Sequence, residues 1–201
     1  MANHSVTLSF HPVRTRLSLL CALLLSVLLA TPAHSLTVVP RSFDELVQRA
    51  DTVMVGTVQD VHSEFADNGL DQNILSFVSF IELQIIKGQI PTQKYTLQVP
   101  GGVVGRFAQN YPGIPQFQAG QRYVVFIRGN HRDFFPVVGI NQGVFRVLTD
   151  AQGRQVVVRD DIALKAELSR SLSSITRTAP SLDSFLQRIK ALLPAAGESS
   201  P

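Results

Sequence analysis

The sequence is almost free of cysteine. Its one cysteine, Cys21, lies within an apolar run near the N-terminus, and none follows it. Intrachain disulfides are therefore excluded, and the domain that follows has no cysteine nucleophile. A chain without bridges must be held together by its hydrophobic core alone.

Recognisable catalytic motifs are missing as well. No serine stands in the Gly-x-Ser-x-Gly elbow that presents a hydrolase nucleophile. The glycines within residues 101–105 lack the Lys-Ser/Thr ending and the following helix of a phosphate loop. The basic residues are scattered along the chain, whereas nucleic acid binding needs a clustered basic face. We predict no cofactor, no nucleic acid partner and no catalytic constellation.

The N-terminus has the pattern of an export signal. Two arginines precede an apolar run over residues 17–30, and the small residues Ala33 and Ser35 occupy the positions that a signal peptidase reads. The run of about fourteen residues is shorter than the roughly 20 that a membrane-spanning helix needs. We predict a signal peptide over 1–35, cleavage after Ser35, no stable membrane span thereafter, and a periplasmic or extracellular location. An uncleaved N-terminal anchor is the alternative.

Cleavage would leave about 166 residues, enough for one domain with its own core. The whole chain has 18 Lys+Arg and 15 Asp+Glu residues. The predicted signal peptide contains two of the basic residues, Arg14 and Arg16, and no acidic residue. The remainder therefore has 16 basic and 15 acidic residues and a net charge of +1. Cys21 also leaves, and its place in the middle of the run does not fit a lipid-attachment site. An exported domain without cysteine is typical of the bacterial envelope.

The rest of the chain predicts a mainly β domain. Ser42 and Glu45 form a capping box that opens a short helix. Gly56 indicates a bulge or a tight bend within a strand, and Asn68-Gly69 indicates a hairpin turn. Segments rich in alternating and β-branched residues predict strands over 52–61, 74–86, 95–99, 121–128, 134–140, 144–149 and 154–159.

The segment 74–86 is long for a flat strand, and strands of this length usually coil around a small barrel. Its alternation predicts one apolar face, made of Leu75, Phe77, Ile81, Leu83 and Ile85. We predict a five- or six-stranded OB-like β-barrel with short flanking helices at both ends. The barrel domain, including its N-terminal helix, is predicted over 36–160.

A helical C-terminal extension is predicted over 161–201, with a frayed tail after Pro194. Ser181 is placed to cap a helix with one apolar stripe, made of Leu182, Phe185, Leu186, Ile189, Leu192 and Leu193. Such a stripe usually docks on the domain's own core, and we favour this interpretation. A partner-binding or membrane-lying helix is the alternative, although two basic residues are few for a membrane anchor.

The segment 100–120 is unusual because it contains five glycines and three prolines. A connection of this length within a small domain is typically functional or an ordered Ω-loop. Its aromatic residues Phe107, Tyr111 and Phe117 are the candidate binding residues. The alternative, which we favour, is that these side chains plug the open end of the barrel.

A metal site has only weak support in the sequence. His62 and Glu64 share one face of a strand, but metal sites usually need three or four ligands, and nothing places His131 near them. We therefore predict no metal site. The adjacent Asp160 and Asp161 have diverging side chains, so we expect one of them to cap a helix rather than to take part in acid catalysis.

Three stretches of the chain, residues 50–58, 85–88 and 117–126, resemble the layout of the netrin-like domain. That domain is the OB-fold module of tissue inhibitors of metalloproteinases and of complement C-termini, and the likeness covers roughly residues 50–148. The chain also resembles a family of uncharacterised exported bacterial proteins, which share the Ser-Phe-Asp-Glu-Leu opening and the Gly143-x-Phe145-Arg146-Val147 ending. These motifs are structural, so the resemblance implies a fold and says little about activity.

The metalloproteinase inhibitors bind the zinc of their target through a disulfide-bonded N-terminal cysteine, which this chain lacks, so no inhibitory residue carries over. We predict an exported non-enzymatic binding module. Such a module could act as an inhibitor or as an accessory partner of a secreted protease. One alternative is a metal-dependent hydrolase using His62, Glu64 and His131. The other is a structural envelope protein that associates through its C-terminal helix.

Overall fold

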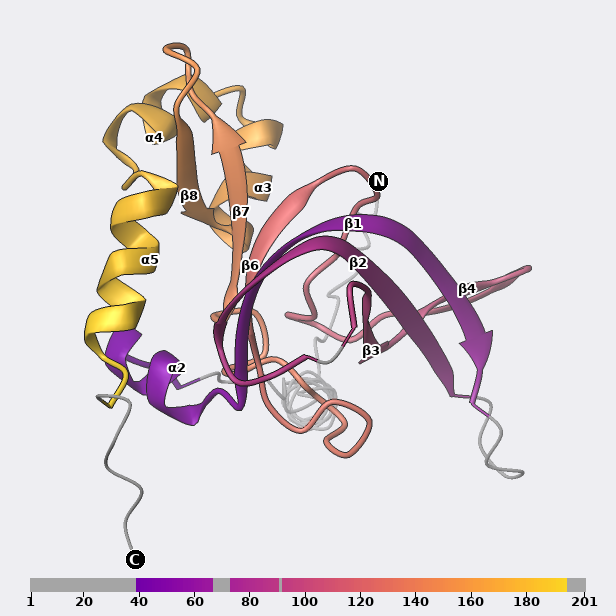
Figure 1. Ribbon diagram of the computed structural model, residues 1–201. Helices are drawn as coiled ribbons and strands as arrows, with labels where there is room; N and C mark the ends of the chain where they lie inside the picture. Colours follow the sequence, from indigo (N-terminus) through magenta and orange to yellow (C-terminus); the bar gives the residue numbers. More distant parts are fainter. Residues whose placement is uncertain (1–38, 67–72, 91, 195–201) are drawn as a thin grey trace, which may run out of the picture. The chain divides into compact units, whose positions relative to one another are not determined.

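A six-stranded antiparallel sheet carries the fold, together with a two-stranded sheet and four short helices (Figure 1). The computed structural model describes residues 39–66, 73–90 and 92–194. The predicted signal peptide, the predicted turn at Asn68-Gly69 and the predicted frayed tail lie outside the described residues. The prediction of a mainly β domain is confirmed. No helix among the described residues is long and apolar enough to cross a membrane.

The strands of the large sheet are β1 Thr52–Phe65, β2 Ile74–Lys87, β3 Tyr95–Pro100, β6 Arg122–Ile127, β7 Val144–Thr149 and β8 Gln155–Arg159. Their order in the sheet is β3-β2-β1-β6-β7-β8. The small sheet pairs β4 Gly102–Val104 with β5 Phe107–Gln109. The helices are α2 Phe43–Arg49, α3 Asp160–Leu168, α4 Leu172–Thr178 and α5 Leu182–Ala191.

The sheet does not close into the predicted barrel, because no ladder within the described residues joins β3 to β7 or β8. Both edges are covered in other ways. At the β3 edge, the Asn130 side chain donates to the Thr96 carbonyl at 2.8 Å and accepts from the Gln98 N–H at 3.0 Å. At the β8 edge, the Val157 N–H donates to the Pro180 carbonyl at 2.9 Å. Since these edge groups already have partners, the sheet can end there.

Apolar side chains pack on both faces of the sheet. One face is covered by α2 and α5, and buries Leu46, Val47, Ala50, Val53, Val55, Ile86, Val124, Phe126, Val138, Val147, Val157, Leu182, Phe185, Leu186 and Ile189 (Figure 1). The apolar stripe of α5 therefore docks on the domain's own core. The opposite face buries Met54, Val58, Val78, Phe80, Leu97, Val99, Phe117, Tyr123, Val125, Ile127, Val137 and Val144.

The long strands β1 and β2 bend together, as Figure 1 shows. Their pairing shifts register between Val55 and Thr57, so Gly56 lies at the predicted irregularity. A Cβ atom on Gly56 would lie 3.0 Å from Leu83 Cδ2 and 3.3 Å from Phe80 Cβ. The absence of a side chain thus lets the two strands approach closely at the bend.

The predicted apolar face of β2 is wrong over the first half of the strand. Leu83 and Ile85 pack toward the core, whereas Leu75 and Phe77 lie on the opposite face from the buried Val78. The reason is Glu82, whose φ of 53° interrupts the regular alternation of the strand. Side chains that precede Glu82 in β2 therefore point to the opposite face from the one that strict alternation predicts.

Residues 134–140 do not form the predicted strand. Only Val137 makes a β-bridge, with Ile127, and the rest of the segment is built from turns. Pro136 has no N–H to give to a ladder, and Gly139 and Ile140 have φ angles of 67° and 65°. The segment is therefore part of the connection between β6 and β7, residues 128–143, which we call the β6–β7 loop.

Two of the predicted helix starts are confirmed. The capping box of Ser42 and Glu45 is present, and the Ser181 hydroxyl accepts from the Ser184 N–H at 3.2 Å. The expected capping by Asp160 or Asp161 is wrong, because α3 has no side-chain cap at its N-terminus. Both carboxylates instead pair with arginines.

Candidate functional site

The three aromatic residues singled out in segment 100–120 lie in different surroundings. Phe117 is only 8% exposed and packs edge-on against Phe80 and Tyr123, with ring centroids 5.6 and 5.2 Å away. Phe107 is 45% exposed on β5 and contacts the ring of Phe65. Tyr111 contacts neither of the other two rings. Phe117 therefore occupies the core, and the three do not form one surface.

Tyr111 belongs to a different aromatic cluster, the aromatic triad of Tyr111, Phe134 and Phe135. The Tyr111 ring lies 5.3 Å from Phe134 and 6.4 Å from Phe135, and the two phenylalanine rings are 4.7 Å apart. Phe134 is 51% exposed and Phe135 36% exposed. Two segments distant in sequence thus present adjacent, partly solvated rings.

Sequence reasoning missed Phe134 and Phe135 because it assigned them to a strand. In a strand, neighbouring side chains point to opposite faces, so two adjacent aromatic residues would not form one patch. In the turns of the β6–β7 loop both rings stay in contact with each other and with Tyr111. The available signal was Pro136, which follows the two phenylalanines and argues against a central strand.

The β6–β7 loop is held by hydrogen bonds close to the triad. The Gly129 carbonyl accepts from the N–H groups of Arg132 and Asp133 at 2.9 and 2.7 Å, and the Gly129 N–H donates to Asp51 Oδ2 at 2.9 Å. Gly129 has a φ of 64°, and a Cβ atom there would lie 2.4 Å from Asp133 Cγ. Glycine is therefore favoured at this turn, because another residue would adopt a left-handed φ and displace the Asp133 carboxylate, and the turn fixes the backbone that leads into Phe134.

Tyr111 also borders a small cavity of about 40 Å³, which is lined among others by Val61, Ser76 and Phe117. The Ser76 hydroxyl donates to the Gly101 carbonyl at 2.7 Å and contacts the Ser63 hydroxyl at 2.9 Å. This space suits one or a few water molecules, whereas ligand pockets usually span roughly 300–1,000 Å³. The cavity is therefore too small for a metabolite.

A second, wider hollow adjoins the triad through Phe135. It measures about 210 Å³ and is also lined by Arg41, Arg49, Arg128 and Asp133; we call it the arginine hollow. Arg128 Nε lies 3.7 Å from Asp133 Oδ2. The lining of this hollow thus contains three arginines and one aspartate.

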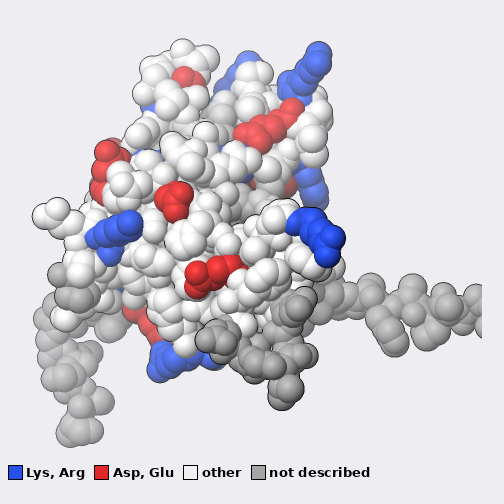
Figure 2. Space-filling model, turned by 90° about the vertical axis from the view of Figure 1, so that its right-hand side faces the viewer, with Lys and Arg blue, Asp and Glu red and all other residues white. Residues whose placement is uncertain are grey.

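On the face that Figure 2 shows, the surface charge is mixed. Figure 2 shows one face of the molecule, on which Lys and Arg residues stand apart from one another with Asp and Glu residues among them. A face of this kind has no continuous basic stripe along which a nucleic acid backbone would lie.

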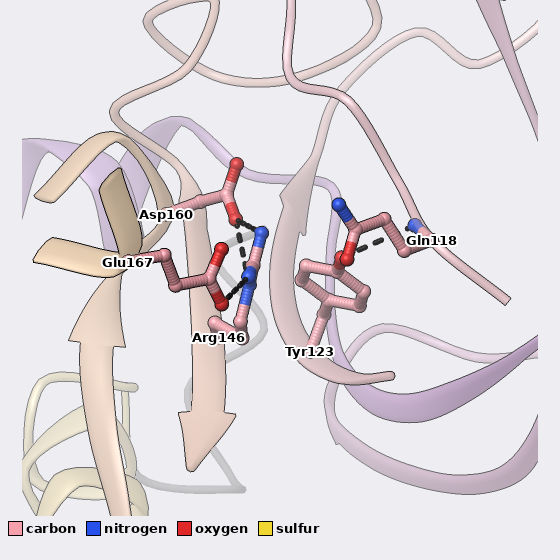
Figure 3. Close-up of polar contacts among 5 residues, drawn as sticks. All are labelled: Gln118, Tyr123, Arg146, Asp160 and Glu167. Atoms are coloured by element: carbon pink, nitrogen blue, oxygen red, sulfur yellow. Dashed lines mark hydrogen bonds and ion pairs between the residues drawn. The ribbon is translucent and has the colours of Figure 1, made fainter. Parts of the chain in front are cut away.

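The most buried ionic group of the described residues is Arg146 on β7 (Figure 3). Its Nε and Nη2 atoms donate to Asp160 Oδ1 at 3.1 and 2.8 Å, and Nη1 donates to Glu167 Oε1 at 2.7 Å. The guanidinium also lies 5.7 Å from the centre of the Tyr123 ring. Because both carboxylates belong to α3, this cluster ties that helix to the sheet.

The cluster around Arg146 does not have the geometry of an active site. Arg146 and Asp160 are both almost completely buried. Burial raises the pKa of Asp160 despite the neighbouring Arg146, and burial also raises the pKa of Tyr123, whose hydroxyl accepts from the Gln118 N–H at 3.2 Å. Arg146 and Asp160 are bonded to each other below the surface, and a substrate would have to displace α3 to reach them.

The candidate metal ligands are not brought together. His62 pairs across the sheet with Phe77, and Phe77 pairs with Gln98, whose side chain contacts His131 Nδ1 at 3.0 Å. Phe77 of β2 and Gln98 of β3 therefore lie between the two histidines. The His62 ring stacks on Phe77, and its Nδ1 lies 3.0 Å from Asp60 Oδ2. No three His, Cys, Asp or Glu side chains gather as metal ligands in the part of the chain that the structure describes.

We compared the chain with known proteins in three ways. A scan against protein-family models, a search of curated proteins and a search of solved structures each found no match. The resemblance to the netrin-like domain therefore stays a prediction, and function has to be argued from the site itself.

Proposed function

We propose that the chain is an exported, non-enzymatic binding module that recognises another exported protein, such as a secreted protease, through the aromatic triad. The observation that carries this proposal is the exposure of Phe134 and Phe135 beside Tyr111. Aromatic residues are enriched at the centres of protein interfaces, where burial of their rings supplies much of the binding free energy. The export part rests on the N-terminal sequence pattern.

The way the triad is held supports a binding role. The hydrogen bonds at Gly129 fix one end of the β6–β7 loop, and the Arg128 N–H donates to the Pro136 carbonyl at 2.8 Å across the base of the turn. A surface that is already ordered loses little conformational entropy when a partner docks on it. Rings on such a loop are therefore better suited to recognition than the same rings on an unrestrained segment.

We also propose that the curled sheet is an OB-like barrel, left open at one seam. The order β3-β2-β1-β6-β7 makes a continuous five-stranded sheet, and OB-folds are partly open barrels of five strands. Asn130, just beyond β6, bonds to the free edge of β3 and so bridges the seam. A netrin-like relationship would be consistent with this arrangement.

The proposal can be tested by capturing partners from bacterial envelope extract on the purified chain. The test variant is Tyr111→Ala with Phe134→Ala, and the matched control is Phe107→Ala, which removes a similarly exposed ring from β5. We expect the wild type and the control to capture the same proteins, and the triad variant to capture them at least about tenfold less. Identical capture by a folded triad variant would overturn the proposal.

A further inference from the structure

The lining of the arginine hollow has an excess of positive charge, with three arginines and one aspartate. Arg41 precedes α2, Arg49 ends it, and Arg128 begins the β6–β7 loop, so three separate points of the backbone converge on one space. Arg41 and Arg49 lie close enough to Glu45 to help lower its pKa, but within the described residues neither guanidinium makes a direct ion pair, and that of Arg128 has only the 3.7 Å contact with Asp133. These guanidinium groups are therefore available to an external anion.

The hollow and the aromatic triad form one surface because Phe135 belongs to both. A ligand that occupies the hollow would meet an aromatic ring at its border. Guanidinium groups match the planar, two-oxygen geometry of carboxylates, and aromatic rings match apolar side chains. The combined surface thus has a charged part and an apolar part side by side.

Resting on the proposed binding function, we propose that the partner docks with an extended segment that carries a carboxylate side chain next to a large apolar side chain. The carboxylate enters the arginine hollow between Arg41 and Arg49, and the apolar side chain packs on Phe134 and Phe135. The hollow, at about 210 Å³, accommodates one side chain and is too small for a folded element. Charge complementarity thus selects an acidic-apolar segment of a second protein.

A selection from a random-peptide display library on the intact chain tests this inference without knowledge of the partner. We expect the selected peptides to share an Asp or Glu within a few residues of a Phe, Leu or Trp. In the Arg41→Gln, Arg49→Gln variant the acidic preference should disappear, while the apolar preference remains. The matched control, Lys165→Gln with Arg177→Gln, removes the same charge from exposed positions on α3 and α4 and should keep both preferences.

The affinity of a selected synthetic peptide provides a second measurement. We expect the arginine variant to bind it roughly tenfold more weakly than the wild type, with an unchanged melting temperature. Raising the salt concentration from about 0.05 to about 0.5 M should weaken wild-type binding several-fold, because exposed charges are screened.

Three results would overturn the inference: a consensus without acidic residues, an acidic consensus that survives the arginine variant, or no selected sequence at all. Self-association of the chain that the arginine variant abolishes would also overturn it, since the occupant would then be a second copy. If envelope capture depends on the triad but the peptides show no acidic preference, the proposed binding function is retained. Only the proposal of an acidic-apolar partner segment is then rejected.

Discussion

At the scale of single residues, the two most informative positions are Arg146 and Gly129. Arg146 is buried and pairs with two carboxylates of α3, and Gly129 has a positive φ at a turn where an added Cβ would meet the Asp133 carboxylate. The first joins a helix to the sheet, and the second shapes the loop that presents the triad. Each position leads to a separate expectation.

Replacing Arg146 by Met would leave Asp160 buried without its partner. We expect the free energy of unfolding to fall by about 3–5 kcal/mol, which is typical when one member of a buried ion pair is removed. Glu167→Gln should cost less than about 1 kcal/mol, because that side chain is partly exposed and its contribution is screened. Urea denaturation measures both. A cost for Arg146→Met no larger than that for Glu167→Gln would contradict the assigned role.

Replacing Gly129 by Ala would force a side chain into the Asp133 carboxylate at a left-handed turn. Gly153→Ala is the matched control, because Gly153 has a φ of 79° but no atom within 4 Å of the added Cβ. The control should lose about 1–2 kcal/mol of stability from the backbone conformation alone. Gly129→Ala should lose more, and it should also weaken partner capture. Equal losses measured by thermal unfolding would show that the contact with Asp133 is unimportant.

At the scale of elements, the hairpin between β7 and β8 contributes to the pH dependence of stability. Burial acts to raise the pKa of Asp150, but hydrogen bonds from the Arg154 backbone and side chain and from the Gln152 N–H outweigh it and lower the pKa below its ordinary value. The stability gained from this carboxylate is therefore present above the unfolded-state pKa of about 3.9 and is lost as the pH falls through the lower folded-state value.

We expect Asp150→Asn to be less stable than the wild type at neutral pH, and to lose less additional stability on acidification below about pH 4. Chemical denaturation at a series of pH values measures this difference. Parallel stability curves for the two proteins would mean that Asp150 has the same pKa in the folded and unfolded chains.

The helix α5 contributes four buried residues to the core. Ending the chain after Pro180 would remove Leu182, Phe185, Leu186 and Ile189 from the core, at roughly 1.5–3 kcal/mol each. Because that sum is comparable to the whole stability of a typical domain, we expect the truncated protein to be unfolded or aggregated. A truncated chain with a cooperative unfolding transition and unchanged stability would favour a helix used for association instead.

Elements with local signals were predictable from the sequence, and elements set by tertiary geometry were not. The capping box at Ser42 and the strand 144–149 depend on neighbouring residues alone, and both are present. The face of β2 was partly wrong because the irregular residue Glu82 carries no sequence signature. The β4–β5 hairpin within segment 100–120 was missed because its strands are only three residues long.

At the scale of the whole molecule, the candidate site depends on contacts between distant segments. Tyr111 was a candidate from composition, but its partners Phe134 and Phe135 come from another loop, and no spacing rule connects them. The same holds for the arginine hollow, which gathers residues from either end of α2 and from the β6–β7 loop. The described strands do not form the predicted closed barrel, and the edge of β3 is bonded instead by Asn130, a residue of a distant loop that no sequence pattern connects with it.

The central claim is that the molecule binds a partner through the aromatic triad, and photo-crosslinking in intact bacteria tests it most directly. A photoreactive phenylalanine analogue is placed at Phe134 in one culture and at Phe107 in another, since both rings are similarly exposed. We expect one dominant cross-linked protein from the probe at Phe134 and none from the probe at Phe107. Equal cross-linking from both positions, or none from Phe134 in a correctly folded protein, would contradict the account.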